Sequence, residues 1–489
     1  MRKSISKNYI YNLAYQILII ILPIITTPYV SRVLGAEGIG VYNYTLSISS
    51  YFILLGSLGI SIYAQREIAY VQDDFEKRSR IFWEVFIIRL VTMAISITIF
   101  YFTYCSGGEY QLYYKILLLE LLANIFEVSY FFQGLEEFKK TITRNFIVKI
   151  VSVLLIFLLV KSPSDLWKYS LIYAFSALLG NLSLWLYLPK YIRKVSIKEL
   201  QMKRHIKPMV ILFIPQVASD IYVVLDKTMI GAMVADKSEV GYYSQAQRVV
   251  KLLLTIVTSM GTVMLPRMSS EFAKGNEKGI INNIKKTFKF VYLLAIPMTL
   301  GIFVIADKFI PWFLGDGYEE SIGLMSIMAI TIIFIGMSNT TGKQFLLPTK
   351  RQKEYTISII GGAVCNIIAN YILIQKFNAY GAAIGTVLAE GTVTILQLYF
   401  VRGKISIKEI LSSSKNYLIA GILMFVVDLI IKNKLLIGVG NLLSLFILIV
   451  VGVLIYLGVL LLLKDDMLNE ILVKVKGFSN QKLKTHFKV

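Results

Sequence analysis

A line of basic and hydroxyl side chains runs through an otherwise apolar segment near residues 244–265. Arg248 and Lys251 lie about one turn apart, and serine and threonine continue the line at spacings of three and four. Side chains at such spacings share one face of a helix. Guanidinium and ammonium groups bind phosphate oxygens strongly in a partly dry site, so this face suits an anionic, hydroxyl-rich solute. Its members are Ser244, Arg248, Lys251, Thr255, Thr258 and Thr262.

A second line of polar residues is related to the first by an internal repeat. The stretch GIGVYNYTLSISS at residues 38–50 aligns with EVGYYSQAQRVVK at residues 239–251, an offset of 201 residues. The same offset carries the basic face onto residues of which five in six are polar, although none is basic. These residues are Asn43, Ser47, Ser50, Leu54, Ser57 and Ser61. Two related helices with matching polar faces predict a shared water-filled cavity, with Asn43, Ser47, Ser50 and Thr255 among its binding residues.

Further charged side chains lie inside apolar segments, where a charge is costly and usually faces a cavity or a partner. Arg89 and Lys227 add basic groups to the predicted binding residues. The acidic groups are candidate carriers of a coupling ion, H⁺ or Na⁺, and they are Asp220, Asp226, Glu120, Glu127 and Glu390. Structural explanations stay open: Arg89 could pair with Glu120 or Glu127, and Asp226 and Lys227 could neutralise charges between packed helices.

The elements that position these residues are about fourteen apolar segments, each near the length that crosses a bilayer. The chain is 56% hydrophobic with a mean hydropathy of +0.66, which excludes an ordinary soluble protein. We therefore expect an all-α polytopic membrane protein. The predicted spans are residues 9–31, 41–64, 81–104, 111–132, 145–160, 169–188, 208–233, 244–265, 290–306, 321–338, 355–374, 381–401, 416–431 and 439–463.

The distribution of basic residues predicts the orientation of the chain. Of the 51 Lys and Arg residues, 37 fall in connections on the side that holds both termini, and 8 fall on the other side. Such a bias places both termini in the cytoplasm and the protein in the cell membrane. The net charge of +21 is explained by these loops facing anionic lipid, and we expect no nucleic-acid partner.

The same sequence argues against catalysis. The cysteines, Cys105 and Cys365, fall in different segments, and both histidines fall in predicted cytoplasmic connections, so we expect no catalytic residue and no metal site. The longest outer connection, near residues 307–321, is too short to fold by itself. No phosphate-binding loop for ATP is present. These features favour a transporter without a cofactor, and not an enzyme.

The repeat also predicts the domain organisation. Six helices in each half, with an even number of spans, give two lobes in the same orientation, and transporters commonly place their site between such repeats. We expect an N-terminal lobe at residues 1–200, a C-terminal lobe at residues 201–405, and two peripheral helices with a basic tail at residues 406–489. A monomer would suffice for this arrangement.

Several stretches carry a resemblance that covers essentially the whole chain. They are PYVSRVLGAEGIGVY at residues 28–42, FFQGLEEFK at 131–139, LDKTMIGAMVADKSEVGYYSQAQRVVK at 225–251, LPRMS at 265–269, CNIIANYILI at 365–374 and YGAAIGTVLAE at 380–390. In these stretches the chain resembles the bacterial polysaccharide (oligosaccharide repeat-unit) flippases of the multidrug/oligosaccharidyl-lipid/polysaccharide exporter superfamily.

The resemblance implies a V-shaped pair of lobes that moves an undecaprenyl-diphosphate-linked oligosaccharide outward by alternating access, for surface polysaccharide such as capsule or exopolysaccharide. It implies that basic residues of the cavity bind the diphosphate, with Arg248 the best match and Lys251 next to it. Arg32, in the family's Ser-Arg-Val-Leu-Gly stretch, is a gate or a loop anchor. The expected partners are the lipid-linked substrate, membrane lipids, and the polymerase and glycosyltransferases of the same pathway.

Three alternatives stay open on the sequence alone. A multidrug cation antiporter of the same superfamily would need an acid-lined cavity, whereas residues 9–31 contain no Asp or Glu. A flippase for a peptidoglycan or teichoic-acid precursor would differ in substrate but not in mechanism. A membrane-embedded glycan polymerase or ligase is the enzyme alternative.

Overall fold

The computed structural model describes residues 5–473, with the side chains of residues 21–213, 224–261 and 264–473. Within this part of the chain every regular element is a helix, and no strand occurs. Long-range contacts divide the chain into two compact units, Met1–Ser244 and Gln245–Val489. The predicted lobes, with their boundary at 200, are defined by the repeat and stay a prediction.

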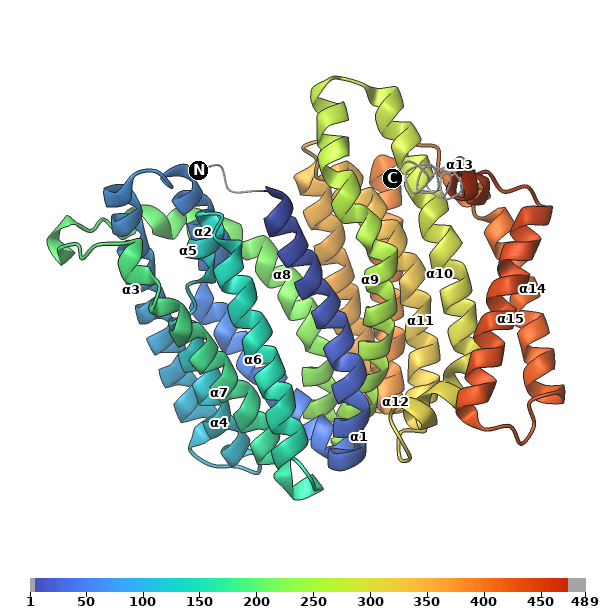
Figure 1. Cartoon of the computed structure of the whole chain (residues 1–489), viewed down its shortest axis with the longest axis horizontal. Coiled ribbons are helices and arrows are strands. Elements are labelled where there is room, and N and C mark those ends of the chain that lie inside the picture. The colour runs from blue at the N-terminus through green and yellow to red at the C-terminus, as the bar shows by residue number, and fades with distance from the viewer. Residues whose placement is uncertain (1–4, 474–489) are drawn as a thin grey trace, which may run out of the picture. The chain divides into compact units, whose positions relative to one another are not determined.

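The first unit contains eight α-helices and the first residues of a ninth (Figure 1). The contacts place α4 and α6 against α7, and α1 against α3, α6 and α8. The helices are α1 (Ile5–Ser57), α2 (Ile60–Tyr70), α3 (Phe75–Phe100), α4 (Gln111–Ile125), α5 (Ser129–Gly134), α6 (Phe138–Leu159), α7 (Leu166–Trp185) and α8 (Lys203–Met233). Short turns of other helical types lie at Tyr101–Cys105, Pro163–Asp165, Leu188–Lys190 and Ile197–Glu199.

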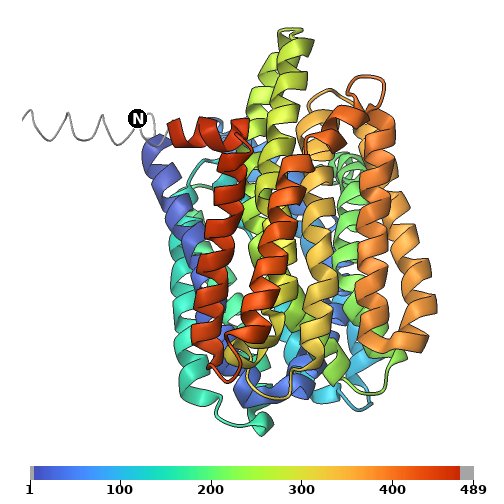
Figure 2. The same cartoon turned by 90° about the vertical axis from the view of Figure 1, so that its right-hand side faces the viewer.

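The second unit contains most of α9 and six further α-helices. Helix α10 packs against α11, α14 and α15, and Figure 2 shows α14 and α15 side by side. The helices are α9 (Ser238–Ala273), α10 (Glu277–Phe313), α11 (Glu320–Ser338), α12 (Gln352–Val401), α13 (Ile407–Ser412), α14 (Lys415–Lys434) and α15 (Asn441–Leu462). A π-helical segment, Asn339–Leu346, continues α11.

The predicted fold class is confirmed. Eleven helical segments of the described chain are long and apolar enough to cross a membrane. Two of them contain two helices each, because α1 breaks at Gly35 (φ 67°, ψ 176°) and α12 breaks at Asn378 (φ 47°, ψ −130°). Together with α8, which those eleven do not include, they account for the fourteen predicted helices. The protein is a multi-pass membrane protein.

The outward-facing side chains are those that a lipid environment favours. On α15, for example, Phe446 and Leu454 are 66% and 65% exposed, and Leu442 and Val453 also face outward. In water such a surface would be a large apolar patch, whereas in a bilayer it meets lipid tails. The buried side of each helix packs on its neighbours, as in the aromatic cluster of Phe82, Phe131 and Trp185 within the first unit.

The internal repeat is visible as a reciprocal contact between two helix starts. A Cβ atom built on Gly40 would lie 1.7 Å from the carbonyl oxygen of Lys237, and one built on Gly241 would lie 2.0 Å from that of Ala36. Gly40 and Gly241 are 201 residues apart, and so are Ala36 and Lys237. Each glycine therefore allows the other repeat's backbone to approach, which a side chain would prevent.

Candidate functional site

The basic line of the repeat lies on α9, as predicted. Arg248 is half-buried, whereas Lys251 and Thr255 are exposed. The hydroxyl groups of Thr255 and Thr258 donate hydrogen bonds to the carbonyl oxygens of Lys251 and Leu254, at 2.9 and 3.0 Å. Such bonds satisfy a hydroxyl within a span while its oxygen can still accept a second hydrogen bond. The side chain of Thr262 lies outside the described residues.

The matching line on α1 is largely used in packing. Asn43 and Ser47 are buried, and Ser50 is half-buried. Asn43 donates to the carbonyl oxygen of Ile39 at 2.8 Å, and Ser50 donates to that of Leu46 at 2.7 Å. These three residues contribute hydroxyl and amide groups to α1, and their predicted contact with a substrate stays a prediction.

A hydrogen-bonded cluster joins this line to α8. Thr228 donates to Ser47 Oγ at 2.9 Å, and the hydroxyl group of Tyr51 lies 3.0 Å from Thr228 Oγ1. Next to Thr228, Lys227 is half-buried and Asp226 is only 2% exposed. The structure thus brings the helix that carries Asp226 and Lys227 against the polar line of α1.

Asp226 has a specific partner. The hydroxyl group of Tyr243 donates to Asp226 Oδ2 at 2.5 Å, which ties the end of α8 to the start of α9. This contact agrees with a structural use of Asp226, while its use as an ion carrier stays a prediction. The side chain of Asp220 lies outside the described residues.

Arg89 forms a buried ion pair with Glu127. Arg89 is 2% exposed, and its Nη1 lies 2.9 Å from Glu127 Oε2. It also donates to the backbone oxygen of Glu127 and, at 2.9 Å, to Ser61 Oγ, and its guanidinium group lies 5.2 Å from the ring centre of Tyr130. The structural pairing that the sequence left open is therefore present, and Glu127, not Glu120, is the partner.

Glu120, Glu390 and Arg32 have other contacts. Glu120 is half-buried on α4, and its backbone oxygen accepts from Asn124. Glu390 is half-buried on α12, and its backbone oxygen accepts from Thr394 at 2.8 Å. Arg32 is exposed, and its Nη1 lies 3.5 Å from the carbonyl oxygen of Pro28, within its own helix.

Comparison with known proteins identifies the family. The model of the family described as "Polysaccharide biosynthesis protein" matches residues 5–272, more than half of the chain. The chain belongs to this polysaccharide biosynthesis family. A second family model, MatE, matches residues 209–372. The resemblance found in the sequence is thereby confirmed.

Full-length relatives agree with this assignment. Over 404 residues the chain is 25% identical to "Putative O-antigen transporter" of Escherichia coli (strain K12), which covers 82% of this chain and 97% of the relative. Over 408 residues it is 24% identical to "Capsular polysaccharide biosynthesis protein CapF" of Staphylococcus aureus, which covers 81% and 99%.

Solved structures share the fold. Lipid II flippase MurJ, in an inward closed conformation, superposes with a TM-score of 0.75 at 18% identity, covering 94% of this chain and 99% of that one. An inward-facing MATE family transporter of the MOP superfamily superposes with a TM-score of 0.60 at 14% identity, covering 78% and 94%. These likenesses assign the transporter fold to this member of the polysaccharide biosynthesis family.

Two buried acids are not singled out by the sequence patterns. Glu84 on α3 is fully buried and accepts hydrogen bonds from Arg204 and from the backbone N–H of Gln201, both at 2.6 Å. Asp428 on α14 is 3% exposed, and its Oδ1 has no hydrogen-bond partner among the described residues. An acid within a predicted span is the signal that could have found both.

His205 is a buried residue at the start of α8. Hydropathy predicts a cytoplasmic connection for it, but it lies in the first turn of α8 and is 2% exposed. Its Nε2 lies 2.6 Å from Glu84 Oε2, and its Nδ1 lies 2.6 Å from the hydroxyl group of Tyr63. Helix α8 begins at Lys203, five residues before the predicted span, and the cytoplasmic location of His205 stays a prediction.

Proposed function

We propose that this protein moves a lipid-linked oligosaccharide from the cytoplasmic to the outer leaflet of the cell membrane by alternating access, for the synthesis of a surface polysaccharide. The family match is the observation that carries the proposal, because it spans residues 5–272 and is joined by relatives over most of the chain. The names of the two relatives, an O-antigen transporter and a capsular polysaccharide biosynthesis protein, support the same substrate class.

The charge on α9 supports an anionic substrate. Arg248 and Lys251 lie on the polar face that Thr255 and Thr258 continue, so phosphate and sugar groups would find cationic and hydroxyl partners on one helix. A drug cation would instead favour acidic residues. We assign diphosphate binding to Arg248 and Lys251. Asn43, Ser47, Ser50, Thr255 and Lys227 are assigned to the glycan and its surroundings.

The experiment is to measure the sidedness of the lipid-linked glycan in cells that carry Arg248→Ala together with Lys251→Ala. We expect the glycan to accumulate on the cytoplasmic leaflet and surface polysaccharide to be lost. The matched control is Lys274→Ala with Lys278→Ala. These two lysines are exposed, one directly after the end of α9 and the other in the first turn of α10, so the control removes the same charge.

Deletion of the whole protein tests the flippase function separately from the assignment of the diphosphate site. Normal sidedness in the double variant, at matched expression, would remove the site assignment alone. Normal sidedness in the deletion strain would overturn the flippase function itself. If the protein were instead a polymerase, the deletion strain would display single repeat units outside.

Transport against a gradient needs an energy source, and we propose proton or sodium antiport. Among the predicted carriers, Glu127 is paired with Arg89 and Asp226 accepts from Tyr243. Glu120 is the candidate we favour, because it is half-buried and no ion pair to it is present among the described residues. Glu120→Gln should abolish the dependence of flipping on the ion gradient, and unchanged dependence would exclude it.

The location and partners follow from the same proposal. Both termini lie in the cytoplasm, the protein works as a monomer without a cofactor, and it is a transporter and not an enzyme. Membrane lipids surround it, and the polymerase and glycosyltransferases of the pathway supply and consume its substrate. A protease-protection assay on tags at either end tests the orientation, since external cleavage at either tag would overturn it.

A further inference from the structure

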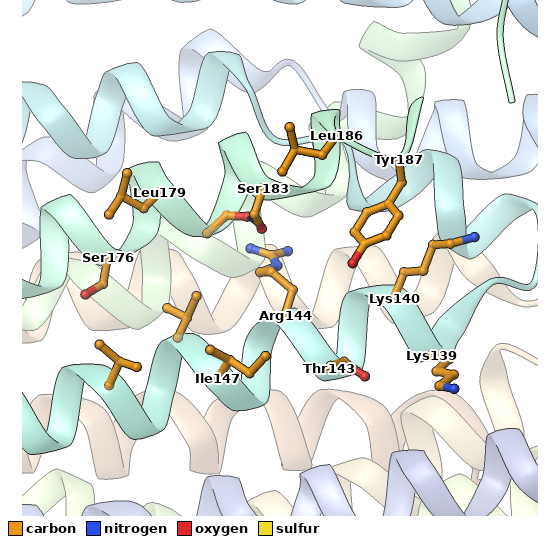
Figure 3. A pocket seen from close by; sticks show the side chains of 13 residues that line it. Lys139, Lys140, Thr143, Arg144, Ile147, Ser176, Leu179, Ser183, Leu186 and Tyr187 are labelled. Carbon is orange, nitrogen blue, oxygen red and sulfur yellow. Dashed lines mark hydrogen bonds between the residues drawn. The ribbon is translucent and has the colours of Figure 1, made fainter. Parts of the chain in front are cut away.

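A groove with two unlike ends lies between α6 and α7 on the first unit. Its volume is about 610 Å³, which is in the range of about 300–1,000 Å³ that small-molecule sites occupy. Figure 3 shows Lys139, Lys140 and Tyr187 near one end, and Ser176 and Leu179 farther along α7. The groove is thus basic at one end and mainly apolar along its length.

Small residues of α7 leave the space for this groove. Ser176, Gly180 and Ser183 follow one another at spacings of four and three, so they share one face of the helix. A Cβ atom on Gly180 would lie 2.9 Å from Val148 Cγ2, so α6 and α7 approach closely there. On either side of that contact, Ser176 and Ser183 have smaller side chains than the aliphatic residues common on α7, and this leaves room for the groove.

The basic end is held in place by bonds within the unit. Arg144 donates to Asn181 Oδ1 at 2.8 Å and to Ser129 Oγ at 2.6 Å. Lys140 pairs with Glu137 at 3.2 Å and lies 4.1 Å from the ring centre of Tyr191. Lys139, Lys140 and Arg144 are the charged residues among those that line the groove, so its lining is positively charged at this end.

Lys139 is placed to meet a ligand. It is exposed, and no ion pair or hydrogen bond to it is present among the described residues. Farther along the groove (Figure 3), Ile147, Val151 and Leu179 are 55%, 44% and 50% exposed. A basic group that adjoins an exposed apolar channel matches a molecule with an anionic head and a hydrocarbon chain.

We propose that this groove binds an anionic phospholipid of the cytoplasmic leaflet. Its phosphate group is held by Lys139 at the basic end (Figure 3), and one acyl chain lies along Ile147, Val151 and Leu179. The basic end adjoins the connection before α6 and the end of α7, which the charge bias places on the cytoplasmic side. Basic pockets between membrane helices on that side bind anionic headgroups. This inference stands independently of the proposed transport function.

The test is a titration of the purified full-length protein with phosphatidylglycerol or phosphatidylcholine, followed by native mass spectrometry. We expect the first phosphatidylglycerol to bind more tightly than phosphatidylcholine. Lys139→Gln should weaken phosphatidylglycerol binding about fivefold, the effect of one basic residue near an anionic surface, and leave phosphatidylcholine binding unchanged. The matched control is Lys198→Gln, an exposed lysine of the turn Ile197–Glu199 away from the groove.

A second variant tests the chain-binding part. Ser176→Phe fills the apolar part of the groove beside Leu179 (Figure 3) without changing charge, and it should weaken the binding of the first phosphatidylglycerol while thermal stability is retained. Equal binding of both lipids by the wild type, or equal behaviour of Lys139→Gln and Lys198→Gln, overturns the proposal. Undecaprenyl phosphate that displaces phosphatidylglycerol at lower concentration would also overturn it, by assigning the groove to a polyprenyl lipid.

Discussion

Gly40 and Gly241 lie against each other, so that a Cβ atom on Gly40 would come within 3.1 Å of the backbone nitrogen of Gly241. The two residues hold equivalent positions in the repeat. Each therefore meets the backbone of the other repeat at nearly the same place, and neither can carry a side chain without moving a helix start.

Gly40→Ala is expected to destabilise the protein. The new methyl group would overlap the carbonyl oxygen of Lys237, and overpacking of this kind costs about 1–3 kcal/mol. The measurement is the thermal unfolding midpoint of the purified protein. Gly38→Ala is the control, because a Cβ atom there comes no nearer than 3.3 Å to Leu34 Cβ. Equal midpoints for the two variants would show that the close approach is absent.

The cluster around Glu84 predicts a second stability effect. Glu84→Ala removes the carboxylate that contacts Arg204, His205 and the backbone N–H of Gln201. These groups then lose a hydrogen-bond partner in a buried place. We expect a loss of about 2–3 kcal/mol in the free energy of unfolding.

Another acid on the same helix gives the control for Glu84. Glu76 pairs with Arg193, but both side chains are more than half exposed, so Glu76→Ala should cost less than about 1 kcal/mol. Comparison of the two unfolding midpoints in one detergent tests the difference. A similar small change for both would mean that Glu84 does not anchor α8.

The pair of Arg89 and Glu127 predicts non-additive effects. Arg89→Gln leaves the Glu127 carboxylate without its cation, and Glu127→Gln leaves Arg89 buried without its anion. Each single variant should lose stability, whereas the double variant should recover about 1 kcal/mol or more relative to the sum. Strictly additive losses would exclude the tie.

The same variants examine the predicted substrate role of Arg89. If Arg89 only ties α3 to the end of α4, the double variant Arg89→Gln with Glu127→Gln should regain flipping together with stability. Sidedness of the glycan is the measurement. A stable double variant that stays inactive would instead assign Arg89 to the substrate.

Asp428 predicts a gain of stability. Its carboxylate packs against Gly452 between α14 and α15, and Oδ1 has no hydrogen-bond partner among the described residues. Asp428→Asn keeps the shape but removes an acid that is costly to bury, so the unfolding free energy should rise by about 1 kcal/mol. Gly452→Ala, whose Cβ would lie 2.5 Å from Asp428 Oδ2, should lower it. A decrease for Asp428→Asn would reveal a partner of the carboxylate.

Hydropathy and periodicity predict the features that depend on local sequence. The fourteen helices follow from long apolar segments, and the face of Arg248 and Lys251 follows from the helical repeat, so both can be derived without contacts. The contact of Gly40 with Gly241 also has a basis in the sequence, since the offset of 201 residues aligns the two glycines.

The features that the sequence does not indicate depend on pairing over long sequence distances. Glu84 and His205 are 121 residues apart, and no pattern along either segment indicates that they meet. The groove cannot be predicted from the sequence, because the small residues Ser176, Gly180 and Ser183 form a groove only when α7 packs beside α6. The choice of Glu127 over Glu120 depends likewise on how α4 ends, which helical spacing alone does not determine.

The anchoring of α8 also bears on how the chain is made. Glu84 contacts Arg204 and His205, and Ser47 contacts Thr228, so the first compact unit is unfinished when α1 to α7 have been synthesised. The ribosome must deliver more than two hundred residues before α8 can dock against α1 and α3. Until then the buried carboxylate of Glu84 lacks these partners. Those early helices therefore need shelter from the insertion machinery, and truncation before α8 should leave a substrate for membrane quality-control proteases.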